Sequence, residues 1–126
     1  MDEVVRAMVE DRKRKRGGFL VNLYRCSLGN PLAPISIDHV GAPIGFHLSE
    51  SRELARDLQR DGLIVIESGS LIRIEPAGAR LVEVWASGVP QTSPHITLKV
   101  MNVQSMEGSQ VQLGTAGSSQ TFGSGD

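Results

Sequence analysis

The chain has 126 residues, 40% of them hydrophobic and only 4% aromatic, which predicts one modest core built from Leu, Ile and Val. No apolar run approaches the roughly 18 residues of a membrane span, the N-terminus lacks a secretory pattern, and the lone Cys26 excludes an internal disulfide, so a cytoplasmic protein is expected. The net charge is −1, but residues 1–26 carry seven basic residues against four acids, whereas residues 27–89 carry five against eight.

The N-terminal region is expected to form two helices. Over residues 2–16, apolar residues recur at the i, i+1, i+4, i+5 spacing of a helix: Val4, Val5, Met8 and Val9. A run of five cations at residues 12–16 leads into Gly17-Gly18, and two glycines cost a helix roughly 2 kcal/mol relative to alanine. A kink or break is therefore predicted at Gly17-Gly18, with a second helix from Phe19 to Leu28.

The middle of the chain alternates short helices with turns. Ser36 has the chemistry of a helix N-cap, and Pro43 should end the helix that follows near Gly41 or Ala42. Ser49 is predicted to cap a longer helix over residues 50–61, which Gly62 closes. Two short β-branched runs, 63–66 and 71–74, surround a Ser-Gly turn and predict a hairpin, after which Pro76 begins a last helix.

This order of elements resembles the winged helix-turn-helix superfamily of bacterial regulators. The segment LQRDGLI, residues 58–64, is similar to the exit from a recognition helix into a wing, and IEPAG, residues 74–78, is similar to the entry into the last helix. The resemblance implies a winged helix-turn-helix domain over residues 19–88. The patterns on either side add an N-terminal basic helix over 1–18 and a β-rich tail over 89–126 that is expected to act in oligomerisation, so an α+β chain in three parts is predicted.

The resemblance also implies a surface for double-stranded DNA. In the family's usual docking, the helix at 49–61 enters the major groove, where arginine binds guanine or a phosphate. The basic run would add sequence-independent phosphate contacts, and the wing would add Arg73. The implied DNA-binding residues are Ser49, Ser51, Arg52, Arg56, Arg12, Lys13, Arg14, Lys15, Arg16 and Arg73.

Each of these features has a second interpretation. Glu53 and Asp57 directly follow Arg52 and Arg56, so this helix face fits a solvated, salt-bridged surface equally well. The basic run fits a solvated helix with acids at positions 10 and 11 as partial partners. The predicted wing tip carries Glu67, where many DNA-binding wings carry a cation.

The leading hypothesis from the sequence is a DNA-binding transcription regulator that acts as an oligomer. The alternative is a winged-helix module for protein interaction or assembly that does not bind DNA. The three histidines and Cys26 lack metal-ligand spacing, and no catalytic or phosphate-loop motif is present. Neither enzymatic activity nor a metal or cofactor is expected, and the N-terminal apolar stripe is too weak to predict a membrane-surface role.

The tail contains a clean alternation over residues 95–101, which predicts a strand with Ile96, Leu98 and Val100 on one face. A strand with an apolar face needs a partner, so residues 95–113 are expected to pair with the same segment of another chain. The Gly/Ser/Gln-rich end fits either one or two rungs of a β-roll, a short polar hairpin or a disordered terminus.

Overall fold

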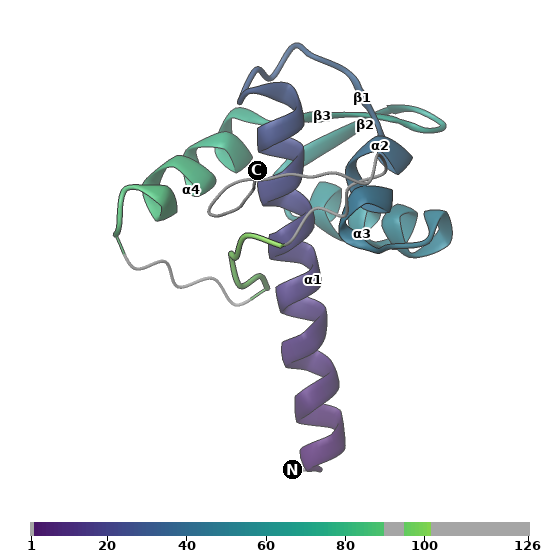
Figure 1. Ribbon diagram of the computed structural model, residues 1–126, viewed down its shortest axis with the longest axis vertical. Helices are drawn as coiled ribbons and strands as arrows, with labels where there is room; N and C mark the ends of the chain where they lie inside the picture. The colour runs from purple at the N-terminus through teal and green to yellow at the C-terminus, as the bar shows by residue number, and fades with distance from the viewer. Residues whose placement is uncertain (1, 90–94, 102–126) are drawn as a thin grey trace, which may run out of the picture.

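The structure is a computed structural model that describes residues 2–89 and 95–101 (Figure 1). The elements in chain order are α1 (Glu3–Ser27), β1 (Ile35–Ser36), α2 (Ile37–Gly41), the 3-10 helix η1 (Ala42–Ile44), α3 (Leu48–Arg60), β2 (Ile64–Ser68), β3 (Leu71–Ile74) and α4 (Pro76–Ala86). The described chain is therefore α+β, with four α-helices around one small sheet.

The first helix, α1, is one continuous helix of 25 residues, so the predicted break at Gly17-Gly18 is wrong. Both glycines are buried, because residues 95–101 cross α1 directly over them. A Cβ on Gly17 would lie 1.9 Å from the carbonyl oxygen of Thr97, and one on Gly18 would lie 2.2 Å from the sulfur of Met101. The glycines lower helix propensity but permit this close approach, and the tertiary contact offsets their cost.

The sheet has three antiparallel strands in the order β1-β3-β2. The predicted hairpin is confirmed: β2 and β3 pair with Ile64 opposite Ile74, and an irregularity follows Ile66. β1 pairs with the outer side of β3, with Ile35 opposite Ile72, and is a strand that the sequence did not predict. Two residues are too few to show the alternation of apolar and polar residues that predicts a strand, so β1 could be recognised only by its pairing with β3.

The ends of the middle helices follow the expected chemistry with two exceptions. Ser36 takes the N-cap position of α2, as predicted, but its side chain makes no cap hydrogen bond. α2 ends at Gly41 and Pro43 lies in the following η1, as predicted. α3 begins at Leu48, one residue before the predicted cap, so Ser49 lies inside its first turn and His47 takes the N-cap position. The His47 side chain makes no cap hydrogen bond, and the prediction that Ser49 caps this helix is wrong.

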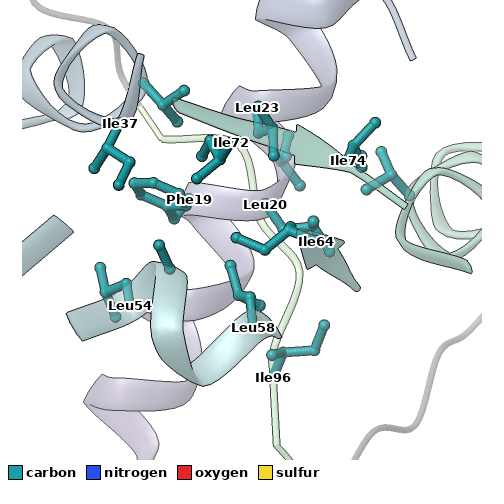
Figure 2. Packing of buried hydrophobic residues seen from close by; sticks show 14 of the residues in the cluster. Phe19, Leu20, Leu23, Ile37, Leu54, Leu58, Ile64, Ile72, Ile74 and Ile96 are labelled. Carbon is teal, nitrogen blue, oxygen red and sulfur yellow. The ribbon is translucent and has the colours of Figure 1, made fainter. Parts of the chain in front are cut away.

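The core lies where α1, α3 and the sheet meet (Figure 2). Its labelled side chains in Figure 2 are Phe19, Leu20, Leu23, Ile37, Leu54, Leu58, Ile64, Ile72, Ile74 and Ile96. All but Ile96 are at most 1% exposed, and burial of each such side chain stabilises the fold by about 1.5–3 kcal/mol. The predicted core of aliphatic residues is confirmed, with Phe19 as its fully buried aromatic member.

Residues 95–101, hereafter the strap, do not form the predicted strand. The Thr97 N–H donates to the carbonyl of Lys13 on α1 at 3.0 Å, and the strap makes no ladder with the described sheet. Ile96 enters the core, with Leu98 and Met101 packed beside it, whereas Val100 is 60% exposed. The alternating pattern did indicate apolar side chains that become buried, but they pack against α1 of the same chain and not against a second chain. Residues 102–113, the rest of the predicted self-association segment, lie outside the described residues.

The N-terminal half of α1 extends beyond the body of the molecule (Figure 1). Its side chains from residue 3 to residue 11 are exposed, and the part packed in the core begins at Gly17. The predicted boundary between residues 18 and 19 therefore falls inside a single helix. Of the helices in residues 2–89 and 95–101, none is both long and apolar enough to cross a membrane.

Candidate nucleic-acid interface

α3 has three different faces, because its apolar, acidic and arginine residues each recur three or four positions apart and so lie on separate sides of the helix. Leu54, Ala55 and Leu58 point into the core and are fully buried. A second face carries acids that reach α1, and a third carries Arg52 and Arg56, which are exposed. Because residues four apart lie on the same side of a helix, these two arginines form one outward pair.

The basic run of α1 lies against the acidic face of α3. Lys15 Nζ is 2.8 Å from Glu50 Oε2, and Arg12 reaches Glu53 at 3.3 Å. The hydrogen bond from Lys15 to Glu50 is the main reason that the pKa of Lys15 is raised. The sequence assigned these cations to DNA phosphates, but the structure places them in ion pairs between two helices.

The other cations of the run also have acidic partners. Lys13 lies 3.4 Å from Glu10, and Arg14 lies 3.8 Å from Asp11, both one turn earlier on α1. Exposed pairs of this kind contribute little to stability, but they reduce the positive potential that the run offers to solvent.

Asp57 is the centre of this network. Its Oδ2 accepts from Arg16 at 3.0 Å and from Arg12 at 3.4 Å, while Oδ1 accepts from Arg60 at 3.3 Å. Only 13% of its side chain is exposed. Burial raises the pKa of Asp57, but the hydrogen bonds and charges of Arg16 and Arg12 outweigh it, so its pKa lies below the ordinary value.

Asp57→Asn is expected to destabilise the fold by about 1–2 kcal/mol at neutral pH, because it leaves partly buried cations without their acceptor. The folded-state pKa of Asp57 is lower than its unfolded value. Its stabilisation is therefore present above about pH 4, the unfolded value, and is lost as the pH falls through the folded value. Urea unfolding at pH 7 and at pH 3 should show the difference between wild type and variant shrinking in acid.

Asp61→Asn is the matched control, since it removes the same charge from an exposed residue at the end of the same helix. It should change stability by less than about 0.5 kcal/mol at either pH. An Asp57→Asn effect that is equally small, or that grows in acid, would contradict the proposed role of the network.

Arg52 and Arg56 line a cavity of about 320 Å³, hereafter the arginine slot. Ile37, Ile66 and Gly69 complete its walls, so the slot lies between the start of α2, α3 and the β2–β3 hairpin. Within the described part of the chain, neither arginine makes a hydrogen bond or an ion pair. Two unpaired guanidinium groups one turn apart can bind an anion such as a phosphate or the edge of a guanine.

Of the two predicted serine contacts, only one reaches the surface. Ser49 is exposed on the first turn of α3. Ser51 is fully buried against Gly41, and its Oγ has no hydrogen-bond partner among the described residues. The assignment of Ser51 to a DNA contact is therefore not compatible with its position, because helix phase turns it towards α2.

Arg73 is the remaining predicted contact. It pairs with Glu67 across the hairpin and donates to the carbonyl of Pro31 at 2.9 Å. Both hydrogen bonds hold the guanidinium close to its own chain, and the acid at the hairpin tip is neutralised by the same pair. The hairpin therefore offers little net charge to a ligand.

The ion-pair network was missed by the sequence analysis, although its spacing was a usable signal. Arg12, Lys15 and Arg16 share one face of α1, and acids at 50, 53 and 57 share one face of α3. Matching stripes of opposite charge at helical spacing indicate two helices that pack along each other. The sequence contained no comparable signal for the arginine slot, because its walls come from three elements that are apart in the chain.

Comparison of the chain with protein-family models, with curated proteins and with solved structures found no match. Within the residues that the structure describes, no cluster of three or more His, Cys, Asp or Glu side chains is placed to hold a metal ion.

Proposed function

We propose that the chain is a winged helix protein that binds double-stranded DNA through the exposed face of α3 and acts as a transcription regulator. One observation carries the proposal: the acids of α3 turn back onto α1, and the outward pair on this helix is Arg52 and Arg56. An objection to this proposal is that acids on a helix that enters the major groove would repel phosphates. Pairing with the basic run of α1 weakens that objection.

In this proposal, α3 enters the major groove with Ser49 at its leading turn. Arg52 and Arg56 either bind guanine or hold the phosphate backbone in the arginine slot. The β2–β3 hairpin is the wing and lies beside the DNA without a strong charge of its own. The basic run contributes indirectly, because it holds α3 against α1 and neutralises its acids.

Replacement of both arginines, Arg52→Ala and Arg56→Ala, is expected to weaken binding to a random 20-base-pair duplex by roughly tenfold or more. Fluorescence anisotropy at two salt concentrations should also show a smaller salt dependence, with a slope reduced by about 2, because two cations no longer contact phosphates. Far-UV circular dichroism should be unchanged, since both side chains are exposed.

The matched control is Lys13→Ala with Arg14→Ala, which removes the same charge from the basic run. Its affinity should stay within about twofold of wild type, because these cations already pair with acids on α1. If the control loses as much affinity as the α3 variant, the charge of the run and not the face of α3 is responsible, and the proposed interface is wrong.

A second candidate function is a winged-helix module for protein interaction, without DNA binding. The apolar walls of the arginine slot, Ile37 and Ile66, and the net charge of −1 favour it. The same titration separates the two functions. Micromolar DNA binding that weakens steeply with salt supports the regulator, and absence of binding at low salt favours the module.

A further inference from the structure

The arginine slot combines charged and apolar lining residues. Arg52 and Arg56 lie one turn apart on α3, and the other side chains that line the slot are Ile37 and Ile66. Gly69, in the turn of the β2–β3 hairpin, has nothing within 4 Å of the place where a Cβ would lie, so the slot is open on that side. Its volume of about 320 Å³ falls within the range of roughly 300–1,000 Å³ that is typical of small-molecule pockets.

The two arginines of the slot have lost the acids nearest to them in the sequence. Glu53 and Asp57 directly follow these arginines, but both pair with cations of α1. Two like charges four residues apart on a helix repel each other, and a bound anion would remove that repulsion. A guanidinium group binds a carboxylate or a phosphate through two parallel hydrogen bonds. The charges of the slot therefore favour an anionic ligand.

The apolar lining adds a second requirement. Ile37 is 1% exposed and Ile66 is partly buried, so a ligand that fills the slot would remove the remaining apolar surface of Ile66 from water. A free inorganic ion has no apolar group to place there. No residue that lines the slot is aromatic, so an aromatic ligand would find no ring to stack on. The slot therefore fits a ligand with an anionic head and an aliphatic body.

We propose that the arginine slot binds a small organic anion. Its carboxylate or phosphate head pairs with Arg52 and Arg56, and its short aliphatic chain lies against Ile66. A consequence for regulation rests on the proposed function. Because the same two guanidinium groups contact DNA there, the anion and the duplex exclude each other, and the anion releases the protein from DNA.

Titration of the full chain with octanoate and with octyl phosphate tests the site without DNA. Both probes carry the same aliphatic chain, so the tighter binder identifies the preferred head group. Isothermal titration calorimetry should give a dissociation constant of about 0.1–1 mM for at least one probe. Acetate and inorganic phosphate, which lack the chain, and 1-octanol, which lacks the charge, should each bind at least about tenfold more weakly.

Two pairs of substitutions test the charge. Arg52→Ala with Arg56→Ala should weaken binding of the preferred probe by about tenfold or more, because both guanidinium groups are removed. Lys13→Ala with Arg14→Ala is the matched control, since it removes the same charge from exposed positions on α1. It should stay within about twofold of wild type.

The apolar contact is tested by chain length and by Ile66→Ala. Affinity should rise from butyrate to hexanoate to octanoate by about threefold or more at each step, as further methylene groups are buried. Ile66→Ala should bind octanoate about threefold more weakly than wild type does. Thermal unfolding without ligand should show that this variant is folded at the titration temperature. The chain-length series needs no substitution and decides the point if the variant is not folded.

Competition with DNA tests the regulation. The preferred probe should displace the duplex from wild type with a midpoint within about threefold of its calorimetric dissociation constant, and chloride at equal ionic strength should displace much less. Displacement no greater than that by chloride would overturn the regulation. Failure of both probes to bind, equal binding of 1-octanol, or unchanged binding in the arginine variant would overturn the site itself. A chain that binds the probe through these arginines but does not bind DNA would support the site and contradict the proposed function.

Discussion

Gly41→Ala is expected to destabilise the fold by about 2–3 kcal/mol, because α2 and α3 leave no space for a methyl group at this position. The added Cβ would lie 1.9 Å from Oγ and 2.9 Å from Cβ of Ser51, and 3.5 Å from the ring of Phe19. The backbone at Gly41 has a φ of −88° and a ψ of −37°, which alanine adopts without strain. The cost is therefore steric, and urea unfolding at pH 7 should measure it directly.

A double-mutant cycle with Ser51→Ala identifies the clash. Ser51→Ala alone should be neutral or slightly stabilising, since the hydroxyl is buried without a hydrogen-bond partner among the described residues. In that background, Gly41→Ala should cost about 1 kcal/mol less, because the nearest atom has been removed. Strictly additive effects would show that Ser51 does not lie against Gly41. DNA affinity should be unaffected by Ser51→Ala, in contrast to the prediction from the sequence.

Gly17→Ala is expected to reduce stability by about 2 kcal/mol, although alanine is the better helix former by about 1 kcal/mol. The new methyl group would meet the backbone of Thr97, which cannot move aside without lifting the strap. Displacement of the strap exposes Ile96, whose burial stabilises the fold by about 1.5–3 kcal/mol, and breaks two hydrogen bonds to α1. Urea unfolding and faster tryptic cleavage after Lys99 should report the loss.

Two comparisons make the cause of this effect specific. Gly18→Ala meets only the flexible end of Met101, so it should cost less than about 0.5 kcal/mol or stabilise slightly. In an Ile96→Asp background, where the strap is already released, Gly17→Ala should become stabilising by up to about 1 kcal/mol. A loss of stability at Gly17 that persists in that background would rule out the strap as its cause.

The parts of the fold that could be predicted from the sequence depend on short-range chemistry. Helix periodicity, the prolines at 43 and 76, and the glycines at 29 and 62 act on neighbouring residues, so the sequence alone specified the hairpin and the approximate extent of α2, α3 and α4. The two-residue error at the start of α3 is of the same local kind, because Ser49 and His47 both lie where a cap is possible.

Tertiary structure decided what each candidate site residue contacts. Lys15 and Glu50 are 35 residues apart, and Arg12 and Asp57 are 45 apart. The matching charge stripes indicated that two helices could pack together, but only the folded chain shows which cation meets which acid. The same limit applied to α3. Its arginines and acids were visible in the sequence, but the way α3 packs on α1 decided that Glu50, Glu53 and Asp57 pair with α1 and that Arg52 and Arg56 line the slot.

The sequence by itself thus determined an α+β chain with an aliphatic core, a β2–β3 hairpin and a helix that carries alternating arginines and acids. The tertiary structure decided that α1 runs unbroken through Gly17-Gly18, that residues 95–101 cover these glycines, and that the basic run neutralises α3. The physical reason is common to all three results. Propensity and capping are energies of neighbouring residues, whereas burial and ion pairing depend on segments that only the folded chain brings together.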